Sequence, residues 1–591
     1  MTSSIPPSTI SCWTALSFRL KKSAGGLWRC SGNEAEGAPF PGKGGGGISM
    51  TRKPTILFVD GLWVEKHGIM SLIPQLERSR FSVHLRLTRN VRRLLASVAE
   101  LEPDVVAFSV TTGWHEHALT MARAVRSRHP GVKILLGGPH VTYFPDVVLD
   151  PAVGVAFYGE CDRELAPGLE ALLDGVPAEL VPNAAARRPG PVGTEVALGP
   201  LAPLAEDLDS LPLPDREHYY RHRFFRNSPY KSFIVSRGCP HDCAFCFNRK
   251  LRELYRGKGK FLRYRSPESV VEEALSLHRR FGMKLASFED DLLTCDRGWL
   301  ERLLTLWHRR VRVPYNLNAT AQALTDESLV RLLKETGIWC VAFGIETGSE
   351  TLRKTLLNKA LTDDQVRRAG SLLKKHAVRF LTYNMFALPG ERLDDALATV
   401  RLNREIGTRL ARCTLFTPFP GTELGDRAAA GNGFPPGTNP RGRGGTIPVG
   451  EADALGRGGT IPGCGGTIPV GEADALGRGG TIPGCGGTIP VGEADALGRG
   501  GTIPGCGEML FGRSALEGPE VARIERLQKL ALLGMRSPAA EKLARFASAI
   551  PAGPVHDLVF WATYFDAVRD YMKTDTLHLL ELGIRSMTDV L

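Results

Sequence analysis

Hydrophobic and polar positions follow two different periods in the first part of the chain. Between residues 53 and 175, short apolar runs alternate with stretches in which apolar positions recur every three or four residues. The runs are typical of strands and the stretches of helices. The expected strands are 56–59, 83–85, 105–110, 134–136 and 155–158, and the expected helices are 68–78, 91–99, 115–128 and 163–173. This alternation predicts an α/β domain with a doubly wound, Rossmann-like parallel sheet.

The same alternation returns between residues 226 and 430, after a Pro- and Ala-rich segment at 176–225 that we interpret as a linker. The expected strands are 233–236, 286–289, 315–319, 340–345, 380–386 and 414–417, and the expected helices are 267–281, 297–310, 325–336, 349–357, 363–376 and 393–406. Six such units predict a partial (β/α)6 barrel. Its active site is expected at the carboxyl ends of the strands.

Three further segments show different patterns. Residues 1–52 have no periodicity and are rich in Ser, Gly and Pro. The sequence from Met50 onward resembles the natural start of a protein that leads into its first strand. We therefore expect residues 1–52 to be a disordered or mistranslated extension. Residues 436–510 hold three identical copies of a 21-residue Gly-rich unit and are expected to form a low-complexity insertion. Residues 511–591 carry helical patterns and predict a small C-terminal helical region.

Composition narrows the class of protein. Hydrophobic residues make up 43% and charged residues 23% of the chain, as in ordinary soluble proteins. We find no apolar run long enough for a membrane span and no secretory signal, and therefore expect a cytoplasmic protein. The net charge is +11, but Lys and Arg are scattered. A small-molecule substrate is therefore favoured over nucleic acid.

Three cysteines carry the strongest chemical signal. Cys239, Cys243 and Cys246 follow an expected strand with the spacing C-x3-C-x2-C. Three thiolates on one loop can hold three irons of a [4Fe–4S] cluster, which leaves the fourth iron open to another ligand. Zinc is the competing interpretation, but structural zinc needs four ligands, and no second C-x2-C pair follows. His241 lies between two of the cysteines and is a poor fourth ligand.

With Phe245 in the aromatic position, this motif resembles that of the radical S-adenosylmethionine (SAM) superfamily. The segments 344–350 (GIETGSE), 387–391 (ALPGE) and 418–422 (PFPGT) are similar to further motifs of that family. The resemblance implies that the open iron binds SAM through its amino and carboxylate groups. One electron, from a donor such as flavodoxin or ferredoxin, then yields a 5′-deoxyadenosyl radical.

By the same resemblance, polar residues at the ends of the barrel strands are candidate SAM contacts. Glu346 and Lys359 are suited to the amino and carboxylate groups of SAM, and Asn318 is a similar candidate. Each could instead be a solvated rim residue. The carboxylates of 289–291 end the second strand, where they could bind cofactor or substrate, or cap a helix.

The first domain lacks G-x-G-x-x-G after its first strand, so a dinucleotide site is unexpected. It resembles the cobalamin-binding domain that precedes many radical SAM barrels, through the segments GGPH at 137–140 and YGEC at 158–161. The motif D-x-H-x-x-G is absent and His67 is misspaced for it, so we expect base-off cobalamin without a His ligand to cobalt. The candidate cobalamin contacts are Ser109, Thr111, Gly137, Gly138, His140, Gly159 and Glu160.

The resemblance implies a cobalamin-dependent radical SAM enzyme. The favoured activity is a C-methyltransferase that moves the methyl group of methylcobalamin to an unactivated carbon of a secondary metabolite. One alternative is an oxidative cyclase or ring-rearranging enzyme on the same scaffold. The other is a non-catalytic cobalamin or redox sensor.

Overall fold

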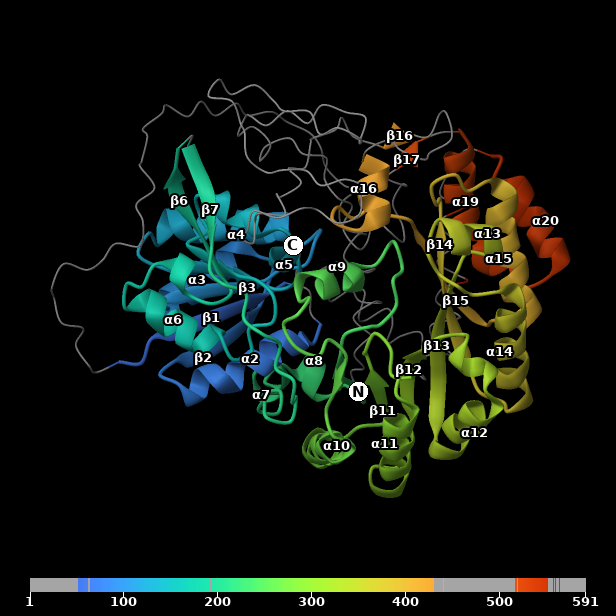
Figure 1. The fold of residues 1–591 in the computed structure, drawn as a ribbon, viewed down its shortest axis with the longest axis horizontal. Coiled ribbons are helices and arrows are strands. Elements are labelled where there is room, and N and C mark those ends of the chain that lie inside the picture. The colour runs from blue at the N-terminus through green and yellow to red at the C-terminus, as the bar shows by residue number, and fades with distance from the viewer. Residues whose placement is uncertain are drawn as a thin grey trace.

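The computed structural model describes residues 52–61, 64–191, 193–429, 439–440, 516–517 and 519–550, together with residues 556, 559 and 563. The expected N-terminal extension up to residue 51, nearly all of the repeat segment and most of 551–591 lie outside these residues. Figure 1 shows two lobes, each built on its own sheet, with helix α9 (Phe247–Leu254) between them. Within the described residues, no helix combines the length and apolar character needed to cross a membrane.

The N-terminal lobe is the predicted doubly wound domain. Its seven-stranded sheet has the order β2-β1-β3-β4-β5-β6-β7, and β1 to β5 are parallel. The strands are β1 (Thr55–Asp60), β2 (Ser82–Leu87), β3 (Val105–Ser109), β4 (Lys133–Gly137), β5 (Val155–Phe157), β6 (Ala184–Gly190) and β7 (Gly193–Leu198). The helices are α2 (His67–Arg78), α3 (Val91–Leu101), α4 (His115–Arg128), α5 (Pro139–Tyr143) and α6 (Leu165–Leu173).

Alternation along β1 explains how both faces of this sheet are covered. Ile56 and Phe58 belong to one buried cluster, together with apolar residues of α2 and α6. Leu57 and Val59 belong to a second cluster, together with residues of α3 and α4. Successive side chains of a strand point to opposite faces, so the centre of a strand that is covered on both sides carries apolar residues at consecutive positions.

The segment expected to be a linker adds two strands to the sheet. β6 pairs antiparallel with β5, and β6 and β7 form a hairpin in which Gly190 faces Gly193. Gly193 has a φ of +88°, which favours glycine. The sequence AAARRPG of β6 contains no β-branched or aromatic residue, so its strand depends on pairing with β5 and gives little local signal.

The second lobe is an open six-stranded parallel sheet with the order β15-β14-β13-β12-β11-β8, a partial barrel. Its strands are β8 (Tyr230–Phe233), β11 (Leu285–Phe288), β12 (Tyr315–Ala319), β13 (Ile338–Glu346), β14 (Phe380–Phe386) and β15 (Leu410–Leu415). Its helices are α10 (Pro267–Phe281), α11 (Arg297–Arg310), α12 (Glu327–Thr336), α13 (Glu350–Thr355), α14 (Asp363–Lys375) and α15 (Leu393–Ile406). The predicted (β/α)6 pattern is confirmed.

The first and last barrel strands begin earlier than predicted. β8 ends at Phe233, and Ser236 belongs instead to the short strand β9 (Ser236–Arg237), which pairs antiparallel with β10 (Arg263–Tyr264). The chain leaves the sheet because Asp290 Oδ1 accepts hydrogen bonds from the backbone N–H groups of Val235, at 2.8 Å, and Ser236. Val235 and Ser236 thus donate to the buried side chain of Asp290 and not to a neighbouring strand, as the sequence pattern alone would predict.

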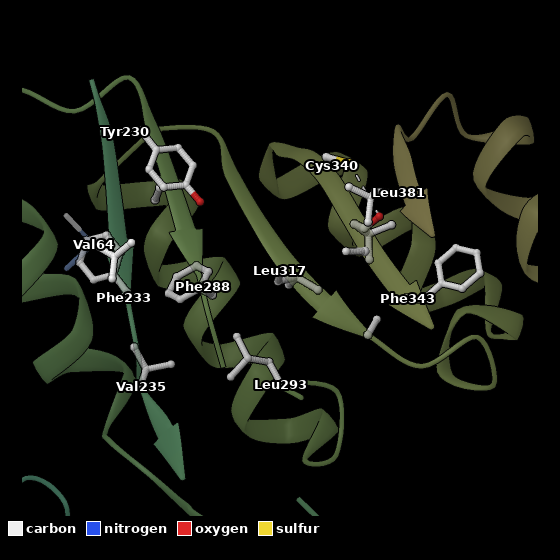
Figure 2. Packing of buried hydrophobic residues seen from close by; sticks show 14 of the residues in the cluster. Val64, Tyr230, Phe233, Val235, Phe288, Leu293, Leu317, Cys340, Phe343 and Leu381 are labelled. Atoms are coloured by element: carbon white, nitrogen blue, oxygen red, sulfur yellow. Dashed lines mark hydrogen bonds between the residues drawn. The ribbon is translucent and has the colours of Figure 1, made fainter. Parts of the chain in front are cut away.

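Aromatic and aliphatic residues on the outer face of the barrel sheet pack beneath its helices. Figure 2 shows Phe233, Phe288 and Leu317 on the neighbouring strands β8, β11 and β12. The ring of Phe288 lies 5.2 Å from that of Trp307 in α11. Val64 of the N-terminal lobe belongs to the same buried cluster, so the two lobes share one core.

Two C-terminal helices, α19 (Pro519–Gly534) and α20 (Pro538–Ala547), complete the described residues of the second lobe. They pack at the end of the barrel where β15 lies: Gln528 Nε2 donates to the carbonyl of Cys413 at 2.7 Å. Glu541 forms ion pairs with Arg401 and Arg404 of α15 at 2.7 and 2.6 Å. This part of the predicted helical region therefore buttresses the barrel.

Candidate functional site

The three motif cysteines lie on one loop at the carboxyl end of the barrel strands. The loop runs from β9 to α9, and Cys246 is the N-cap of α9. All three thiols are half-buried and free, and Phe245 packs on the buried core. The backbone N–H of Cys246 donates to the carbonyl of Cys243 at 3.1 Å, which forms a tight turn between them.

Neighbouring segments hold this loop in place. The backbone N–H of Ala244 donates to the carbonyl of Leu357 at 3.0 Å, and the carbonyl of Ala244 accepts from Leu424 at 2.8 Å. Asn358 Nδ2 donates to the carbonyl of Asp242 at 2.9 Å. The loop is therefore fixed by residues after α13 and at the start of α16 (Glu423–Ala429), so its cysteines are positioned before any cofactor binds.

The donor set of the loop fits an iron–sulfur cluster. Burial raises the pKa of Cys243 to about 12, while the Lys359 ammonium group acts to lower it. Within the described part of the chain, no three His, Cys, Asp or Glu side chains converge closely enough to hold one metal ion. Three free thiols on one loop are a donor set that three irons of a [4Fe–4S] cluster can take.

Glu346 and Lys359 form an ion pair beside the cysteine loop. Glu346 ends β13 with a φ of +69°, and Lys359 Nζ lies 2.8 Å from its Oε1. Lys359 also donates to the carbonyl of Gly344 at 2.9 Å. Its charge acts on the pKa of both His241 and Cys243, which places the pair next to the loop. The structure thus places Glu346 and Lys359 beside the cysteine loop.

Asn318 lies on the same edge, on the neighbouring strand. Its Nδ2 donates to the carbonyl of Asp290 at 2.9 Å, and its Oδ1 accepts from the Tyr383 hydroxyl at 3.1 Å. Burial raises the pKa of Asp290 to about 7, against the hydrogen bonds from Ser236 and Val235. Of the carboxylates after β11, Asp290 therefore serves the backbone that leads into the cysteine loop.

Most candidate cobalamin contacts gather at the carboxyl edge of the N-terminal sheet. Gly138 has a φ of +96°, and a Cβ there would lie 2.9 Å from Ser109 Oγ, so only glycine fits against β3. Gly137 ends β4 beside it, and the carbonyl of Thr111 accepts from the backbone of α4. These small residues leave backbone accessible at the edge where doubly wound sheets bind ligands.

The two histidines considered from the sequence occupy different environments. His140 Nδ1 lies 3.0 Å from Thr112 Oγ1, and its ring stacks on His115 at 3.8 Å. Burial lowers the pKa of His140 to about 3. His67 Nε2 lies 2.9 Å from Ser232 Oγ of the barrel, so His67 points into the contact between the lobes. The structure thus places His140 at the carboxyl edge of the N-terminal sheet and His67 at the contact between the lobes.

Gly159 and Glu160 face the barrel lobe. A Cβ at Gly159 would overlap the Tyr255 hydroxyl. Glu160 Oε2 lies 2.6 Å from Arg237 Nη1, and its Oε1 lies 2.5 Å from Arg263 Nη2. The carboxylate that the sequence assigned to cobalamin is therefore engaged by two arginines of the other lobe.

The two ligand-binding edges meet at α9. The ring of Tyr143, in α5 of the N-terminal lobe, stacks on Phe247 at 4.3 Å, and its hydroxyl donates to the Phe247 carbonyl at 3.4 Å. Phe247 directly follows Cys246. The pKa of Tyr143 is raised by burial and, in smaller part, by Cys246 and Asp291. The GGPH turn and the cysteine loop thus lie side by side.

Sequence reasoning missed three residues of this junction. Tyr143, Asp162 and Tyr255 connect the lobes, yet no motif contains them. A signal was present only for Asp162, which stands two residues after Glu160 in a run of polar residues that follows a strand. Their roles depend on contacts between distant segments, which local patterns do not encode.

Comparison with known protein families agrees with this architecture. Residues 56–166 match the B12 binding domain, and residues 233–402 match the Radical SAM superfamily. The chain is 27% identical over 341 residues to an uncharacterised methyltransferase of Pyrococcus horikoshii, which covers 57% of this chain and 71% of that protein. It is 29% identical over 365 residues to cytidylyl-2-hydroxyethylphosphonate methyltransferase of Streptomyces wedmorensis, covering 55% and 66%.

A solved structure shows the same fold. The radical SAM methyltransferase TsrM from Kitasatospora setae, with cobalamin and a [4Fe–4S] cluster bound, superposes with a TM-score of 0.55 at 18% identity. The match covers 67% of this chain and 82% of TsrM. The two domains imply a [4Fe–4S] cluster, SAM and cobalamin as cofactors. The chain therefore joins a B12-binding domain, at residues 56–166, to a domain of the Radical SAM superfamily, at residues 233–402, and the two relatives described above are named methyltransferases.

Proposed function

We propose that this enzyme transfers a methyl group from cobalamin to an unactivated carbon of a small secondary metabolite. The observation that carries the proposal is the junction at α9, where Tyr143 of the B12-binding domain stacks on Phe247, next to Cys246. A methyl donor and a radical source must act on the same substrate carbon, and this junction brings their two binding edges together.

The chain's own residues supply binding and orientation. Cys239, Cys243 and Cys246 would hold the cluster, while Glu346 and Lys359 present a carboxylate and an ammonium group to SAM. The glycines of the GGPH turn and Ser109 would lie against cobalamin. When bound, these cofactors supply hydrogen-atom abstraction and a transferable methyl group. The protein holds the cofactors in the positions and orientations that the reaction requires.

An electron donor must reach the cluster, and a charged groove beside the cysteine loop supports a protein donor such as flavodoxin or ferredoxin. The groove encloses about 590 Å³, and Asp242 of the loop forms part of its wall. Its cations are Arg249, Arg252 and Arg256, and its anions are Asp242 and Glu253. Complementary charge on an acidic carrier would speed its encounter with this surface.

The test is an anaerobic assay of the full chain with reconstituted cluster, cobalamin, dithionite as reductant and SAM that carries a deuterated methyl group. An extract of cells of the organism that encodes this protein supplies candidate substrates, and mass spectrometry identifies the products. A methyltransferase yields 5′-deoxyadenosine, S-adenosylhomocysteine and a metabolite that has gained the deuterated methyl group. A cyclase or ring-rearranging enzyme yields 5′-deoxyadenosine without matching S-adenosylhomocysteine. A sensor consumes no SAM, and either of these results rules out the proposal.

A further inference from the structure

Residues 159–162 of the B12-binding domain contact the barrel lobe on both sides of the cysteine loop. Arg237 directly precedes Gly238 and Cys239, and Tyr255 ends the helix that follows Cys246. Arg237 is bound by Glu160 and Asp162, and the Tyr255 hydroxyl accepts the backbone N–H of Glu160 at 2.6 Å. One short loop of the first lobe thus contacts both the strand that precedes the cysteine loop and the far end of the helix that follows it.

The contact between Arg237 and Asp162, which lies just before the cysteine loop, is bidentate. Arg237 Nη1 and Nη2 lie 2.6 and 2.9 Å from the two carboxylate oxygens of Asp162, a geometry that fixes orientation as well as distance. Arg263 stands opposite Arg237 in the β9–β10 pair and binds Glu160 through Nη1 and Nη2. Both arginines therefore bind the same loop from one small ribbon.

One residue, Gly238, separates the β9–β10 ribbon from Cys239. Gly238, between Arg237 and Cys239, has a φ of +91°, and a Cβ there would collide with the backbone around the Phe261 carbonyl. Gly238 therefore has a left-handed conformation in which only glycine fits, and it joins Arg237 directly to Cys239. Burial disfavours charge at Asp162, yet its pKa is lowered because Arg237 lies against it, so the pair is ionised.

The other end of the loop 159–162 leads back to the cobalamin edge. Gly159 has a φ of +75°, and its backbone N–H donates to Thr142 Oγ1 at 3.0 Å. Thr142 lies in α5, the helix that follows the Gly137-Gly138 turn. A change at the GGPH turn can therefore reach residues 159–162 through a single hydrogen bond.

We propose that residues 159–162 are a positioning element that couples occupation of the B12 site to the geometry of the cysteine loop. Glu160 and Asp162 act on the cysteine loop through Arg237 and Arg263. The inference rests on binding of cobalamin and the cluster, as the proposed function does, but not on methyl transfer. Because coupling free energy is reciprocal, a formed cluster should in turn strengthen cobalamin binding.

The test titrates hydroxocobalamin into the full chain, with and without reconstituted cluster, and compares the two apparent Kd values by absorbance. We expect cluster formation to tighten binding by about fivefold or more in the wild type. The ratio of the two Kd values should fall to near one in Arg237→Lys, which loses the bidentate contact with Asp162. It should also fall to near one in Tyr255→Phe, which loses the acceptor for the Glu160 N–H. Iron and sulfide content is measured for each variant.

The matched control is Asp150→Asn, which removes a carboxylate that Arg123 binds at 2.5 and 2.9 Å inside the B12-binding domain. It should keep the wild-type ratio. If Arg237→Lys fails to fold, Tyr255→Phe decides the matter alone. A wild-type ratio of one, an unchanged ratio in the folded variants, or an equal loss in Asp150→Asn would overturn the proposal. None of these readings requires a methylated product, so a failure of the proposed activity remains distinguishable.

Discussion

Lys359 Nζ lies 2.8 Å from Glu346 Oε1 and 2.9 Å from the carbonyl of Gly344, so one ammonium group joins the end of β13 to the segment after α13. This pair depends on the absence of a side chain at residue 344. A Cβ there would lie 2.7 Å from Lys359 Nζ and would overlap the Glu346 carboxylate.

We therefore expect Gly344→Ala to displace both side chains and to weaken SAM binding by about tenfold, or about 1.4 kcal/mol. The measurement is the SAM concentration that gives half-maximal 5′-deoxyadenosine formation. Gly131→Ala is the control, because a Cβ at that position meets nothing within 4 Å. If the SAM concentration for half-maximal activity were unchanged in Gly344→Ala, the ion pair would not contribute to SAM binding.

Loss of one motif cysteine should remove the cluster. In Cys243→Ala, we expect iron and sulfide content to fall to a small fraction of the wild-type value, with loss of visible absorbance and of 5′-deoxyadenosine formation. Cys295→Ala is the matched control, because Cys295 is an exposed free thiol outside the motif. A Cys243→Ala variant that still cleaved SAM would contradict the mechanism.

Glu391 should make stability fall as pH rises. Burial raises its pKa to about 8 from an ordinary value of 4.5, against the hydrogen bond that the backbone N–H of Leu388 donates to it at 3.1 Å. Between these two pH values the folded chain keeps a proton that the unfolded chain has lost. Stability contributed by the neutral acid is thus fully present below about pH 4.5 and is lost as pH approaches 8.

Glu391→Gln should therefore flatten the decline of Tm across this window, and its advantage over the wild type should grow with pH. Thermal unfolding of the cofactor-free chain at several pH values measures this. Glu335→Gln, at an exposed position on α12, should leave the pH dependence unchanged. A parallel decline in Glu391→Gln and the wild type would assign the pH dependence to other groups.

Reversal of charge in the groove should impair a protein electron donor selectively. Arg256 is exposed and lines the groove, so Arg256→Glu should slow SAM cleavage driven by reduced flavodoxin by about tenfold at low salt. The loss should shrink at high salt, because screening weakens exposed charge pairs. Cleavage driven by dithionite should stay unchanged.

Arg128→Glu, on the exposed surface of α4, is the control for net charge and should match the wild type with both reductants. An equal loss with flavodoxin and dithionite in Arg256→Glu would indicate damage to the cluster loop. No loss with flavodoxin would place the donor elsewhere.

Most of the fold was predictable because its strands and helices are strongly periodic. Helices α10, α11 and α15 have the predicted bounds, since each combines an apolar stripe with clear end signals, such as the Ser266 cap of α10. The hairpin of β6 and β7 was missed because Ala-rich strands carry little local preference. The early end of β8 was missed because it depends on Asp290, more than fifty residues later in the chain.

The candidate site was predictable where chemistry fixes spacing along the chain. The cysteine trio and the Glu346 segment are local motifs, and the structure brings them together. Glu160 shows the limit of this approach, because the same YGEC segment that suggested cobalamin binding directs its carboxylate to Arg237 and Arg263. A motif identifies which residue is unusual, whereas its partner is determined by the packing of the two lobes.

The ion pairs of residues 159–162 also limit how this protein can be divided or recombined. Arg263 is almost fully buried, and the carboxylate that neutralises it comes from the other lobe. A chimera that buries Arg263 against a partner lobe without Glu160 would leave a buried cation without its counter-charge, which is strongly destabilising. The two lobes are therefore not interchangeable modules, and a chimera must inherit Glu160 and Asp162 together with Arg237 and Arg263.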